Sequence, residues 1–364
     1  MGGKHIDIAG AGVAGLATAV ALAQDGANVV VHERAPEITE VGAGLQISAN
    51  GIRALRAIGL DGALMGVALR SRGVRLIDGL NDRLVLELVP KSPSYFVHRA
   101  RLIEVLADGA IGSGVEIRTG TSLSPGTSEA DFVIGADGIR SNFRAAIDGE
   151  SEARFTGQVA WRAVIEDGTA SAKAEVYMGP GRHLVTYPLA GGLRNIVAFE
   201  ERADWAEESW YLEDRPMAVR AAFARFPERV QTWLGEVTKL YLWGLFRHPV
   251  AETWEDGRQV LVGDAAHPTL PYLAQGANLA LEDAVVLARA LAGPGLSAYG
   301  PARRGRAKAV VDAATSNAWR FHIASPILRQ TAFAALKVRE ALRPGAGARS
   351  FDWVWGYDPT SAKL

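Results

Sequence analysis

The sequence predicts an α/β protein whose parallel sheet is interrupted along the chain by antiparallel strands. Three observations lead to this prediction: a strand–helix–strand pattern at the N-terminus, two blocks of alternating apolar residues, and two further short apolar strands that each end in glycine. A chain of 364 residues is long enough for one large domain or two ordinary ones. A simple nicotinamide-dependent dehydrogenase would keep its βαβ units together, so the interruptions argue against that class of protein.

The composition is ordinary for a globular protein and excludes several kinds of chemistry. Hydrophobic residues make up 48% of the chain, charged residues make up 22%, and the formal net charge is −1. Neither nucleic acid nor an anionic membrane is therefore expected as a partner. The lack of cysteine excludes disulfides, thiolate metal ligands, a cysteine nucleophile and a cofactor attached through sulfur, and we expect no metal site.

The apolar run at residues 8–23 could be mistaken for a signal peptide or a membrane span. It is rich in glycine and alanine, it is too short to cross a bilayer, and Lys4 is the only lysine or arginine before it. We therefore expect a cytoplasmic protein.

The N-terminal unit is predicted to be a strand at 4–9, a helix at 13–24 and a second strand at 27–33, with a G-x-G-x-x-G motif in the first turn. Gly10 would permit the tight turn, and Gly12 would let a pyrophosphate approach the helix N-terminus. Gly15 would let the helix pack closely on the strand. The motif favours a Rossmann-type dinucleotide site over a purely structural turn, but it does not separate NAD from FAD.

Two residues at the end of the second strand extend this predicted site. Glu33 stands where a carboxylate would accept a hydrogen bond from a ribose hydroxyl. Arg34, beside it, could face the pyrophosphate or the adenine. Both positions fit a bound dinucleotide.

The rest of the chain alternates between helical and antiparallel patterns. Helical periodicity occurs at 49–58, with Ser48 as a suitable N-cap, and at 99–111. Alternation over 71–97 predicts a hairpin, and 130–134 and 259–262 are short buried strands. The other predicted strands are 159–165, 174–178, 183–188, 194–200 and 240–246, and the other predicted helices are 216–226, 228–235, 277–291 and most of 302–343.

Further motifs accompany the two short buried strands. They lie at residues 131–141 (DFVIGADGIRS), 260–268 (VLVGDAAHP), 274–278 (AQGAN) and 282–283 (ED). In this order and spacing, together with the N-terminal glycines, they make the sequence resemble the single-component FAD-dependent aromatic hydroxylases, the p-hydroxybenzoate hydroxylase family. The resemblance covers nearly the whole chain.

Within that family the sequence is most similar to the branch of salicylate hydroxylase and 3-hydroxybenzoate 6-hydroxylase. The segments that carry this likeness are 42–46 (GAGLQ), 97–99 (VHR), 272–277 (YLAQGA) and 351–358 (FDWVWGYD). The related 6-hydroxynicotinate hydroxylases have a histidine at the position of Gln46, so that substrate is less expected here.

The resemblance implies a Rossmann-type FAD-binding domain with a glutathione-reductase-like parallel sheet, an inserted antiparallel-sheet substrate domain and a C-terminal helical segment. With the strand pattern, it predicts a discontinuous division of the chain. The FAD-binding domain would comprise 1–70, 98–152 and 251–297, the substrate-binding domain 71–97 and 153–250, and the helical region 298–364.

The resemblance also implies which residues hold a non-covalent FAD. Asp264 would accept hydrogen bonds from the ribityl chain, and Arg99 would contact the ribityl chain or the pyrophosphate. The helix N-terminus at 276–278 would face the N1–C2=O edge of the flavin, where the reduced ring carries negative charge. The full implied set is Gly10, Gly12, Ala14, Gly15, Glu33, Arg34, Gly44, Gln46, Arg99, Asp137, Gly138, Gly263, Asp264, Gly276, Ala277 and Asn278.

Structural alternatives stay open for several of these features. Asp264 could merely cap the following segment. Arg140 could act on FAD or on the nicotinamide cofactor, or it could be a salt-bridge partner. His267 is expected to be held by backbone rather than to donate a proton. The basic residues Arg303, Arg304, Arg306 and Lys308 are expected to form a solvated helix face.

The family chemistry implies that NADH or NADPH reduces FAD, and that O2 then forms a C4a-hydroperoxyflavin. This species would hydroxylate a small hydroxylated aromatic acid, salicylate-like or 3-hydroxybenzoate-like. Pro271 and Tyr272 are the expected substrate-pocket residues. Tyr187 and Phe199 of the antiparallel sheet are added with less weight, and Gln46 could face either the flavin or the substrate ring. For a general base, Tyr187, His183, Glu200 and water remain alternatives. The position of hydroxylation, any decarboxylation and the preference for NADH or NADPH stay open.

Other functions and the oligomeric state also stay open. Relatives with this cofactor fold act on larger polycyclic or lipid-like substrates, and a flavin-binding redox sensor would show no turnover. The tail residues Trp319, Phe321, Ile323, Ile327 and Leu328 are interleaved with basic residues, so we expect core and interface rather than a membrane contact. The aromatic-rich tail is compatible with a homodimer.

Overall fold

A five-stranded parallel sheet forms the centre of one half of the molecule. The computed structural model describes residues 1–38, 43–168, 171–203 and 212–364. The strand order is β16-β9-β1-β2-β8, and every neighbouring pair is parallel. The strands are β1 (His5–Ala9), β2 (Asn28–Glu33), β8 (Glu116–Thr119), β9 (Phe132–Gly135) and β16 (Gln259–Leu261).

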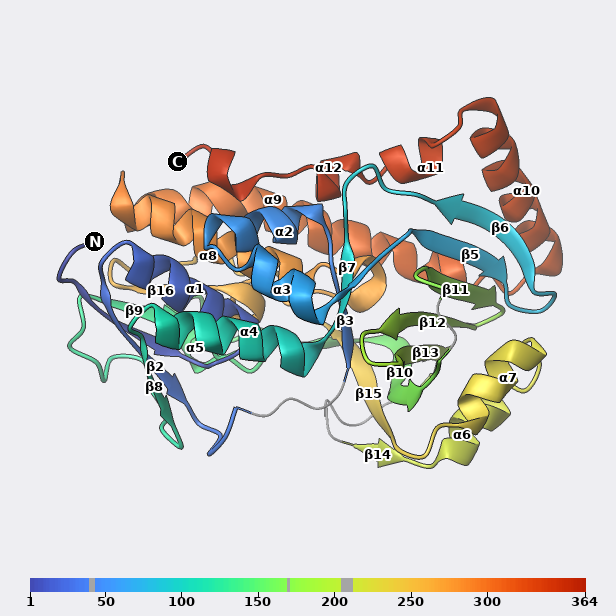
Figure 1. Cartoon of the computed structure of the whole chain (residues 1–364), viewed down its shortest axis with the longest axis horizontal. Helices are drawn as coiled ribbons and strands as arrows, with labels where there is room; N and C mark the ends of the chain where they lie inside the picture. The colour runs from blue at the N-terminus through green and yellow to red at the C-terminus, as the bar shows by residue number, and fades with distance from the viewer. Residues whose placement is uncertain (39–42, 169–170, 204–211) are drawn as a thin grey trace.

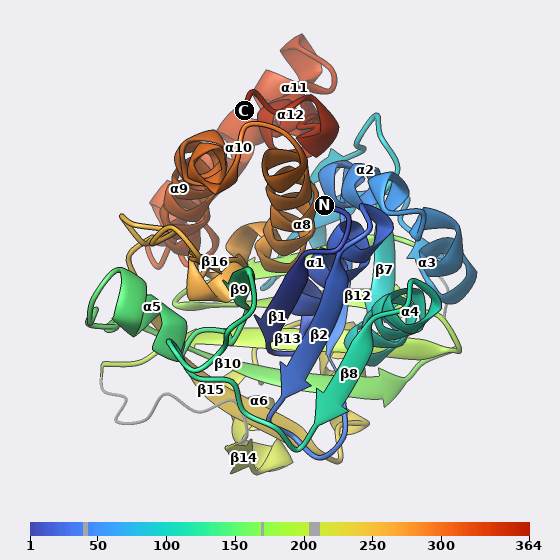
Figure 2. The same cartoon turned by 90° about the vertical axis from the view of Figure 1, so that its left-hand side faces the viewer.

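Helix α1 (Val13–Gln24) packs between α4 (Arg99–Gly112) and α8 (Gly276–Ala292), and Figure 2 shows these three helices beside the parallel sheet. Eight consecutive residues of α1 are buried, which explains why this run is apolar throughout rather than amphipathic. Helix α5 (Asn142–Ile147) contacts β9 and β16. The predicted βαβ unit is thus the core of this half.

An eight-stranded mixed sheet forms the other half of the molecule (Figure 1). Its order is β14-β15-β10-β13-β12-β11-β5-β6. The strands are β5 (Val74–Asp78), β6 (Arg83–Leu88), β10 (Arg154–Glu166), β11 (Ala174–Gly179), β12 (Arg182–Leu189), β13 (Leu193–Glu201), β14 (Glu213–Asp214) and β15 (Leu240–Arg247). The two predicted antiparallel blocks therefore share one sheet, joined by a parallel pairing of β5 with β11.

A third, small sheet was not expected from the sequence as a separate unit. It has the order β3-β7-β4, with β3 (Gly44–Ile47), β4 (Leu69–Arg70) and β7 (Tyr95–His98). The alternating pattern at 71–97 was predicted as a single hairpin, but β7 leaves it to pair with β3. Strands this short carry too little alternation to be assigned to a partner.

The remaining helices cover the two halves. They are α2 (Ala49–Ala57), α3 (Asp61–Val67), α6 (Pro216–Ala222), α7 (Glu228–Gly235), α9 (Tyr299–Asn317), α10 (Pro326–Leu342), α11 (Ala346–Arg349) and α12 (Asp352–Trp355). Core side chains between the eight-stranded sheet and helices α6 and α7 include Trp161, Tyr177 and Phe223. In the part of the chain that is described, no helix combines the length and apolarity needed to span a bilayer.

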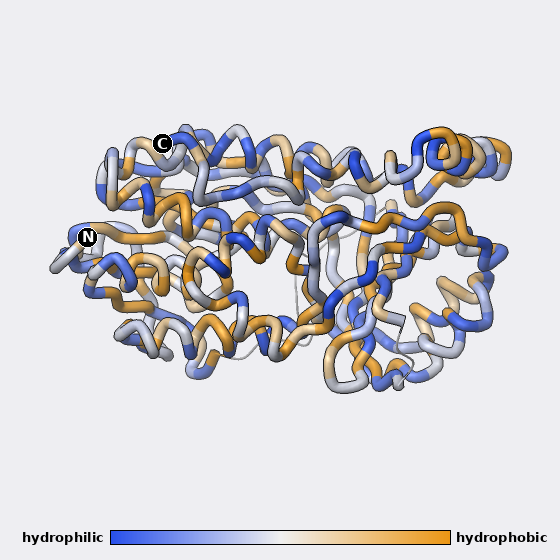
Figure 3. Tube along the Cα trace, turned by 45° about the horizontal axis from the view of Figure 1, so that its top comes forward, coloured by the Kyte–Doolittle hydropathy of each residue, from blue (hydrophilic) through white to orange (hydrophobic). Residues whose placement is uncertain are grey.

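The tail differs from its prediction in part. Trp319, Ile327 and Leu328 were expected in the core or an interface. They are 62%, 79% and 64% exposed in the single chain, so they are not part of its core. Apolar and hydrophilic residues alternate along α10 in Figure 3. Phe333, by contrast, is buried against the eight-stranded sheet. One side of α10 therefore anchors the helix and another is open to solvent.

Candidate active site

The three glycine-containing motifs follow neighbouring strands of the parallel sheet. The Ala136 amide donates to Ala9 O at 3.0 Å, and the Val262 amide donates to Gly135 O at 3.1 Å. The carboxyl ends of β1, β9 and β16 thus lie side by side. The chain proceeds from β1 to β2 on one side, whereas β9 lies on the other, and ligands of open α/β sheets bind in the crevice at such a switch point.

Gly10 ties the first motif to the second. Its φ of +104° favours glycine, and a Cβ there would lie 2.5 Å from Ala136 O. A Cβ at Gly15 would overlap Gly10 O, as expected for the glycine that lets the helix approach the strand. Both glycines are therefore required by the folded chain itself.

Gly263 ties the third motif to the first. It has a φ of +62°, and a Cβ there would lie 2.7 Å from the Cβ of Ala14. Gly12 is different, because it is the N-cap of α1 with φ −79° and a Cβ on it would meet no atom within 4 Å. Open space therefore lies at the α1 N-terminus, where unpaired amides favour an anionic group.

Replacing Gly12 with alanine should separate ligand binding from folding. The backbone there suits any residue and no protein atom is close, so the free energy of unfolding without cofactor should not fall. The added methyl group would occupy the space that a pyrophosphate needs, so FAD affinity should fall about tenfold or more. Flavin titration and urea unfolding of the apoprotein measure the two effects. Gly66→Ala, in α3 with nothing within 4 Å, is the control, and equal FAD affinity in both variants would contradict this prediction.

Glu33 lies at the mouth of the first turn. Its Oε2 accepts from the Ala11 amide at 2.8 Å and its Oε1 accepts from the Ala35 amide at 2.9 Å. The carboxylate is therefore held in place beside the glycine turn, where it could accept a ribose hydroxyl. Arg34, next to it, is exposed.

Asp137 and Gly138 follow β9. Asp137 Oδ2 accepts from the Asn142 amide at 2.8 Å, which helps to start α5. Its Oδ1 is buried without a hydrogen-bond partner, and a Cβ on Gly138 would meet nothing within 4 Å. A buried oxygen without a partner beside open space fits a bound polar ligand.

Asp264 follows β16 and is accessible to solvent, although protein atoms surround it on most sides. Both properties are expected of a side chain on the wall of a deep crevice. Burial raises the pKa of Asp264, and His267, Arg99 and His248 oppose that rise. The amide of Arg99 donates to Ala43 O at 2.9 Å, which places the start of α4 against β3.

The N-terminus of α8 is available to a ligand. Its first internal hydrogen bond runs from the Leu279 amide to Gln275 O at 2.8 Å, so the amides at 276–278 make no bond within the helix. Ala274, just before it, has φ +51°, an uncommon conformation outside glycine. A helix N-terminus of this kind could hold the electron-rich edge of a flavin.

The side chain of Asn278 has a structural role. Its Oδ1 accepts from the Ser48 amide at 2.9 Å, and its Nδ2 donates to Gln46 O at 2.9 Å and Ala274 O at 2.8 Å. It therefore fixes β3 and α2 to the start of α8, leaving only its amide for a ligand. Ser48 precedes α2 as predicted, but its hydroxyl bonds Asn50 Oδ1 at 2.6 Å rather than capping the helix.

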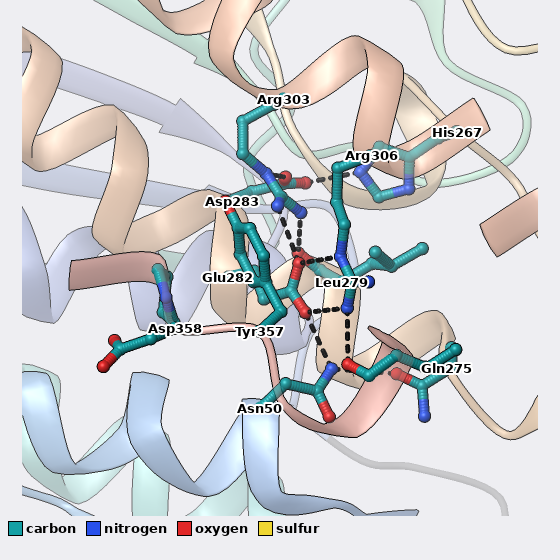
Figure 4. Close-up of polar contacts among 12 residues, drawn as sticks. Asn50, His267, Gln275, Leu279, Glu282, Asp283, Arg303, Arg306, Tyr357 and Asp358 are labelled. Carbon is teal, nitrogen blue, oxygen red and sulfur yellow. Dashed lines mark hydrogen bonds and ion pairs between the residues drawn. The ribbon is translucent and has the colours of Figure 1, made fainter. Parts of the chain in front are cut away.

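His267, Glu282, Asp283, Arg303 and Arg306 form a buried ionic cluster (Figure 4). Asp283 Oδ2 accepts from the Gly263 amide at 2.9 Å and contacts His267 Nε2 at 2.5 Å, while its Oδ1 accepts from Arg303 Nε at 2.8 Å. Burial raises the pKa of Asp283, but His267 and Arg303 outweigh it and the net shift is downward. His267 is thus held by a carboxylate, not by backbone as expected.

The prediction of a solvated basic face on α9 was wrong for two of its four residues. Arg303 is fully buried and donates to Glu282 Oε2 at 2.6 Å, and Arg306 donates to Glu282 Oε1 at 3.0 Å. Arg304 and Lys308 are exposed. The signal was in the sequence, because Arg303 is in helical phase with the buried apolar residues Ala307, Val310 and Ala314.

A cavity of about 160 Å³ lies between the α8 N-terminal loop and the eight-stranded sheet. Gln46, Pro271 and Tyr272 line it as predicted for the substrate pocket, and so does Phe199. Phe351 and Trp355 of the C-terminal segment close another side. No Lys, Arg, Asp or Glu side chain is among the described residues that line it.

Tyr187 is not among the residues that line this cavity. Its ring stacks on Phe96 with centroids 4.8 Å apart, and a Cβ on Gly44 would come within 2.6 Å of it. Burial raises the pKa of Tyr187, which disfavours proton transfer at neutral pH. This placement favours packing of Tyr187 beneath β3 over contact with substrate.

Gly42 of the GAGLQ segment lies outside the described residues.

His183 lines the cavity and is almost fully buried. Its ring stacks on Phe199 with centroids 4.2 Å apart and planes 3° apart, and its Nδ1 contacts His322 Nε2 at 2.6 Å. Burial lowers the pKa of His183 well below 6.5, and His322 lowers it further. His183 is therefore neutral at neutral pH, with Nε2 left as the ring nitrogen that a ligand could reach.

Three motifs that converge at the switch point of a parallel sheet, next to an apolar cavity, are typical of a dinucleotide-dependent enzyme. The chain matches the family model described as "FAD binding domain" over residues 5–314, and it belongs to this family. The free oxygen of Asp137, the open space at Gly12 and the unbonded amides at 276–278 fit such a cofactor.

The chain is similar to several monooxygenases and hydroxylases of aromatic acids. It is 35% identical to a 3-amino-4-hydroxybenzoate 2-monooxygenase of Streptomyces cremeus, over 78% of this chain and 77% of the relative. It is 33% identical to a 3-hydroxybenzoate 6-hydroxylase of Klebsiella oxytoca, over 78% and 79%. A salicylate hydroxylase substrate complex superimposes with a TM-score of 0.81 at 25% identity, over 98% and 96%.

These findings confirm the predicted family, the α/β fold class and FAD as the cofactor. They also confirm the class of enzyme, an FAD-dependent hydroxylating monooxygenase. The roles of individual site residues and the domain boundaries stay predictions.

Proposed function

We propose that this enzyme uses FAD, NADH or NADPH, and O2 to hydroxylate a small hydroxylated aromatic acid in the cavity beside Tyr272. The size of the cavity carries the proposal. Its volume is about 160 Å³, and a cavity of roughly 150 Å³ holds one benzene-sized ring. A single ring is therefore favoured over a polycyclic substrate, and relatives named for hydroxybenzoates support this class.

When bound, FAD supplies the hydride-accepting and oxygen-transferring chemistry. The protein would hold its pyrophosphate at the α1 N-terminus and its ribityl chain at Asp264. The amides at 276–278 would stabilise negative charge on the ring edge. The proposed cofactor set remains Gly10, Gly12, Ala14, Gly15, Glu33, Arg34, Gly44, Gln46, Arg99, Asp137, Gly138, Gly263, Asp264, Gly276, Ala277 and Asn278.

His183 is the best-supported proton acceptor for the substrate hydroxyl among the three predicted candidates. A neutral imidazole can accept at one ring nitrogen while it donates at the other, and His183 lines the cavity. Glu200 is ion-paired with Arg182 at 3.4 Å and Arg202 at 3.0 Å. Tyr187 packs beneath β3 instead of lining the cavity. Removing the proton makes the aromatic ring more electron-rich and so more reactive toward oxygen transfer.

A panel of mono- and dihydroxybenzoates tests the proposed substrate class. For each compound, NADH and NADPH oxidation, oxygen uptake and hydroxylated product are measured with the holoenzyme. We expect at least one single-ring acid to stimulate NAD(P)H oxidation and to yield product in proportion to the oxygen consumed. Turnover only with polycyclic phenols would contradict the substrate class, and no stimulation by any aromatic compound would favour the redox sensor.

Self-association and location remain predictions. The exposed apolar residues of α10, Ile327, Leu328, Val338 and Leu342, could be covered by a second copy of the chain, which supports the predicted homodimer. Sedimentation of the wild type beside Leu328→Glu would measure it. The cytoplasmic location rests on the sequence alone.

A further inference from the structure

We propose that the proton taken from the substrate leaves the cavity through a relay of three side chains, from His183 to His322 to Glu201. The inference rests on the proposed function, because it assumes a phenolic substrate that loses its proton at His183. It adds two residues to the site that neither the motifs nor the comparisons assign. His322 comes from the segment between α9 and α10, and Glu201 is the last residue of β13.

The geometry is continuous from the cavity to solvent. His183 Nδ1 lies 2.6 Å from His322 Nε2, and His322 Nδ1 lies 3.0 Å from Glu201 Oε1. Only 1% of the His322 side chain is exposed, compared with 51% of the Glu201 side chain. The first two members are thus enclosed, and the third delivers the proton to water.

Aromatic rings shield the inner part of the relay from water. Phe199 stacks on His183, and Phe321 and Tyr272 lie with ring centroids 5.1 and 5.9 Å from it. A proton accepted by His183 in such a wall needs a fixed path, because bulk water does not reach the ring directly. His322 is the polar group that the protein supplies there.

The charged and polar groups around His322 support a proton carrier. Burial lowers the pKa of His322, Glu201 opposes that shift through its charge and hydrogen bond, and Arg182 adds to the lowering. Gln158 Nε2 lies 3.2 Å from His322 Nδ1, and the Gln158 carbonyl accepts from the Tyr272 hydroxyl. The second histidine is therefore neutral at rest and next to an anion, and its Nδ1 proton is directed to Glu201 rather than to the Gln158 amide.

The proton count balances along this path. The substrate O–H bond breaks and its proton goes to His183 Nε2, while the proton on His183 Nδ1 goes to His322 Nε2. The proton on His322 Nδ1 goes to the Glu201 carboxylate, which releases it to water. Each imidazole ends neutral as the other tautomer, and the substrate keeps the electron pair as a phenolate.

Strand alternation makes Glu200 a matched control for Glu201. In the β12–β13 register, Arg182 is opposite Glu200 and His183 is opposite Phe199. Glu200 pairs with Arg182 and Arg202, whereas Glu201 contacts His322. The two carboxylates are adjacent in sequence, but only one belongs to the relay.

The test measures proton release when the holoenzyme binds 3-hydroxybenzoate. A pH indicator in weak buffer follows the release in a stopped-flow instrument, and the change in flavin absorbance follows binding. We expect Glu201→Gln and His322→Gln to slow proton release about tenfold or more with little change in affinity. Glu201→Asp should restore much of the rate, and Glu200→Gln should behave as wild type.

Proton release from Glu201→Gln at the wild-type rate would overturn the relay. So would an equal loss of rate in Glu200→Gln, because the effect would then follow surface charge. If the wild type binds the acid but releases no proton, proton removal at His183 is wrong, and the relay falls with it. If no hydroxybenzoate binds, the proposed substrate class is wrong, a distinct outcome read from the flavin signal alone.

Discussion

Replacing Asp283 with alanine is expected to lower the free energy of unfolding by about 3–5 kcal/mol, the typical cost of breaking a buried ion pair. The carboxylate is fully buried and contacts the Gly263 amide, His267 and Arg303. Its loss leaves the Arg303 guanidinium buried with Glu282 as its remaining charged partner. Urea unfolding of the apoprotein measures the change.

The control is Asp312→Ala, which removes an exposed carboxylate paired with Arg247 at 2.9 Å and Lys308 at 3.2 Å. Exposed pairs contribute about 0–1 kcal/mol, so this variant should unfold close to wild type. Equal stabilities of the Asp283 and Asp312 variants would show that the buried cluster does not hold the third motif in place.

Replacing His183 with asparagine is expected to lower the rate of substrate hydroxylation by about 10²–10⁴-fold, the range for removal of a general base. NAD(P)H oxidation should continue, with oxygen consumed without product. Burial holds the pKa of His183 well below 6.5, so the wild type should keep a neutral acceptor down to below that pH. The acid limb of its kcat/KM profile should therefore lie below 6.5 and disappear in the variant.

His5→Asn is the control for this variant, because His5 is exposed at the start of β1 and no residue of β1 lines the cavity. It should leave product yield and pH profile unchanged. An unchanged ratio of product to oxygen in His183→Asn would contradict the role of His183 as proton acceptor.

The glycine motif after β1 indicated a dinucleotide site by itself, whereas the place of the second and third motifs at the same cofactor was implied by the resemblance to the FAD-dependent hydroxylases. Each motif follows a short buried strand, and carboxyl ends of parallel strands meet at one edge of a sheet. Gly10 next to Ala136 and Gly263 next to Ala14 are the resulting contacts.

The proposed substrate cavity is formed by residues that lie far apart in the sequence, so no local sequence pattern predicts their contacts. His183 and His322 are 139 residues apart, and no periodicity links a strand residue to a short connecting segment. Tyr187 was expected in the pocket because it is aromatic, but its ring packs against Phe96 and Gly44, beneath β3. The burial of Arg303, in contrast, could have been predicted from its helical phase.

The most direct test of convergence on one flavin is an equilibrium titration of FAD into flavin-free protein. Wild type should bind one FAD per chain. Asp264→Ala should bind it about ten- to a hundredfold more weakly, as expected when hydrogen bonds to a charged group are lost. An Asp264→Ala protein that binds FAD as tightly as wild type, and stays fully yellow after gel filtration, would contradict the convergence of the three motifs on one flavin.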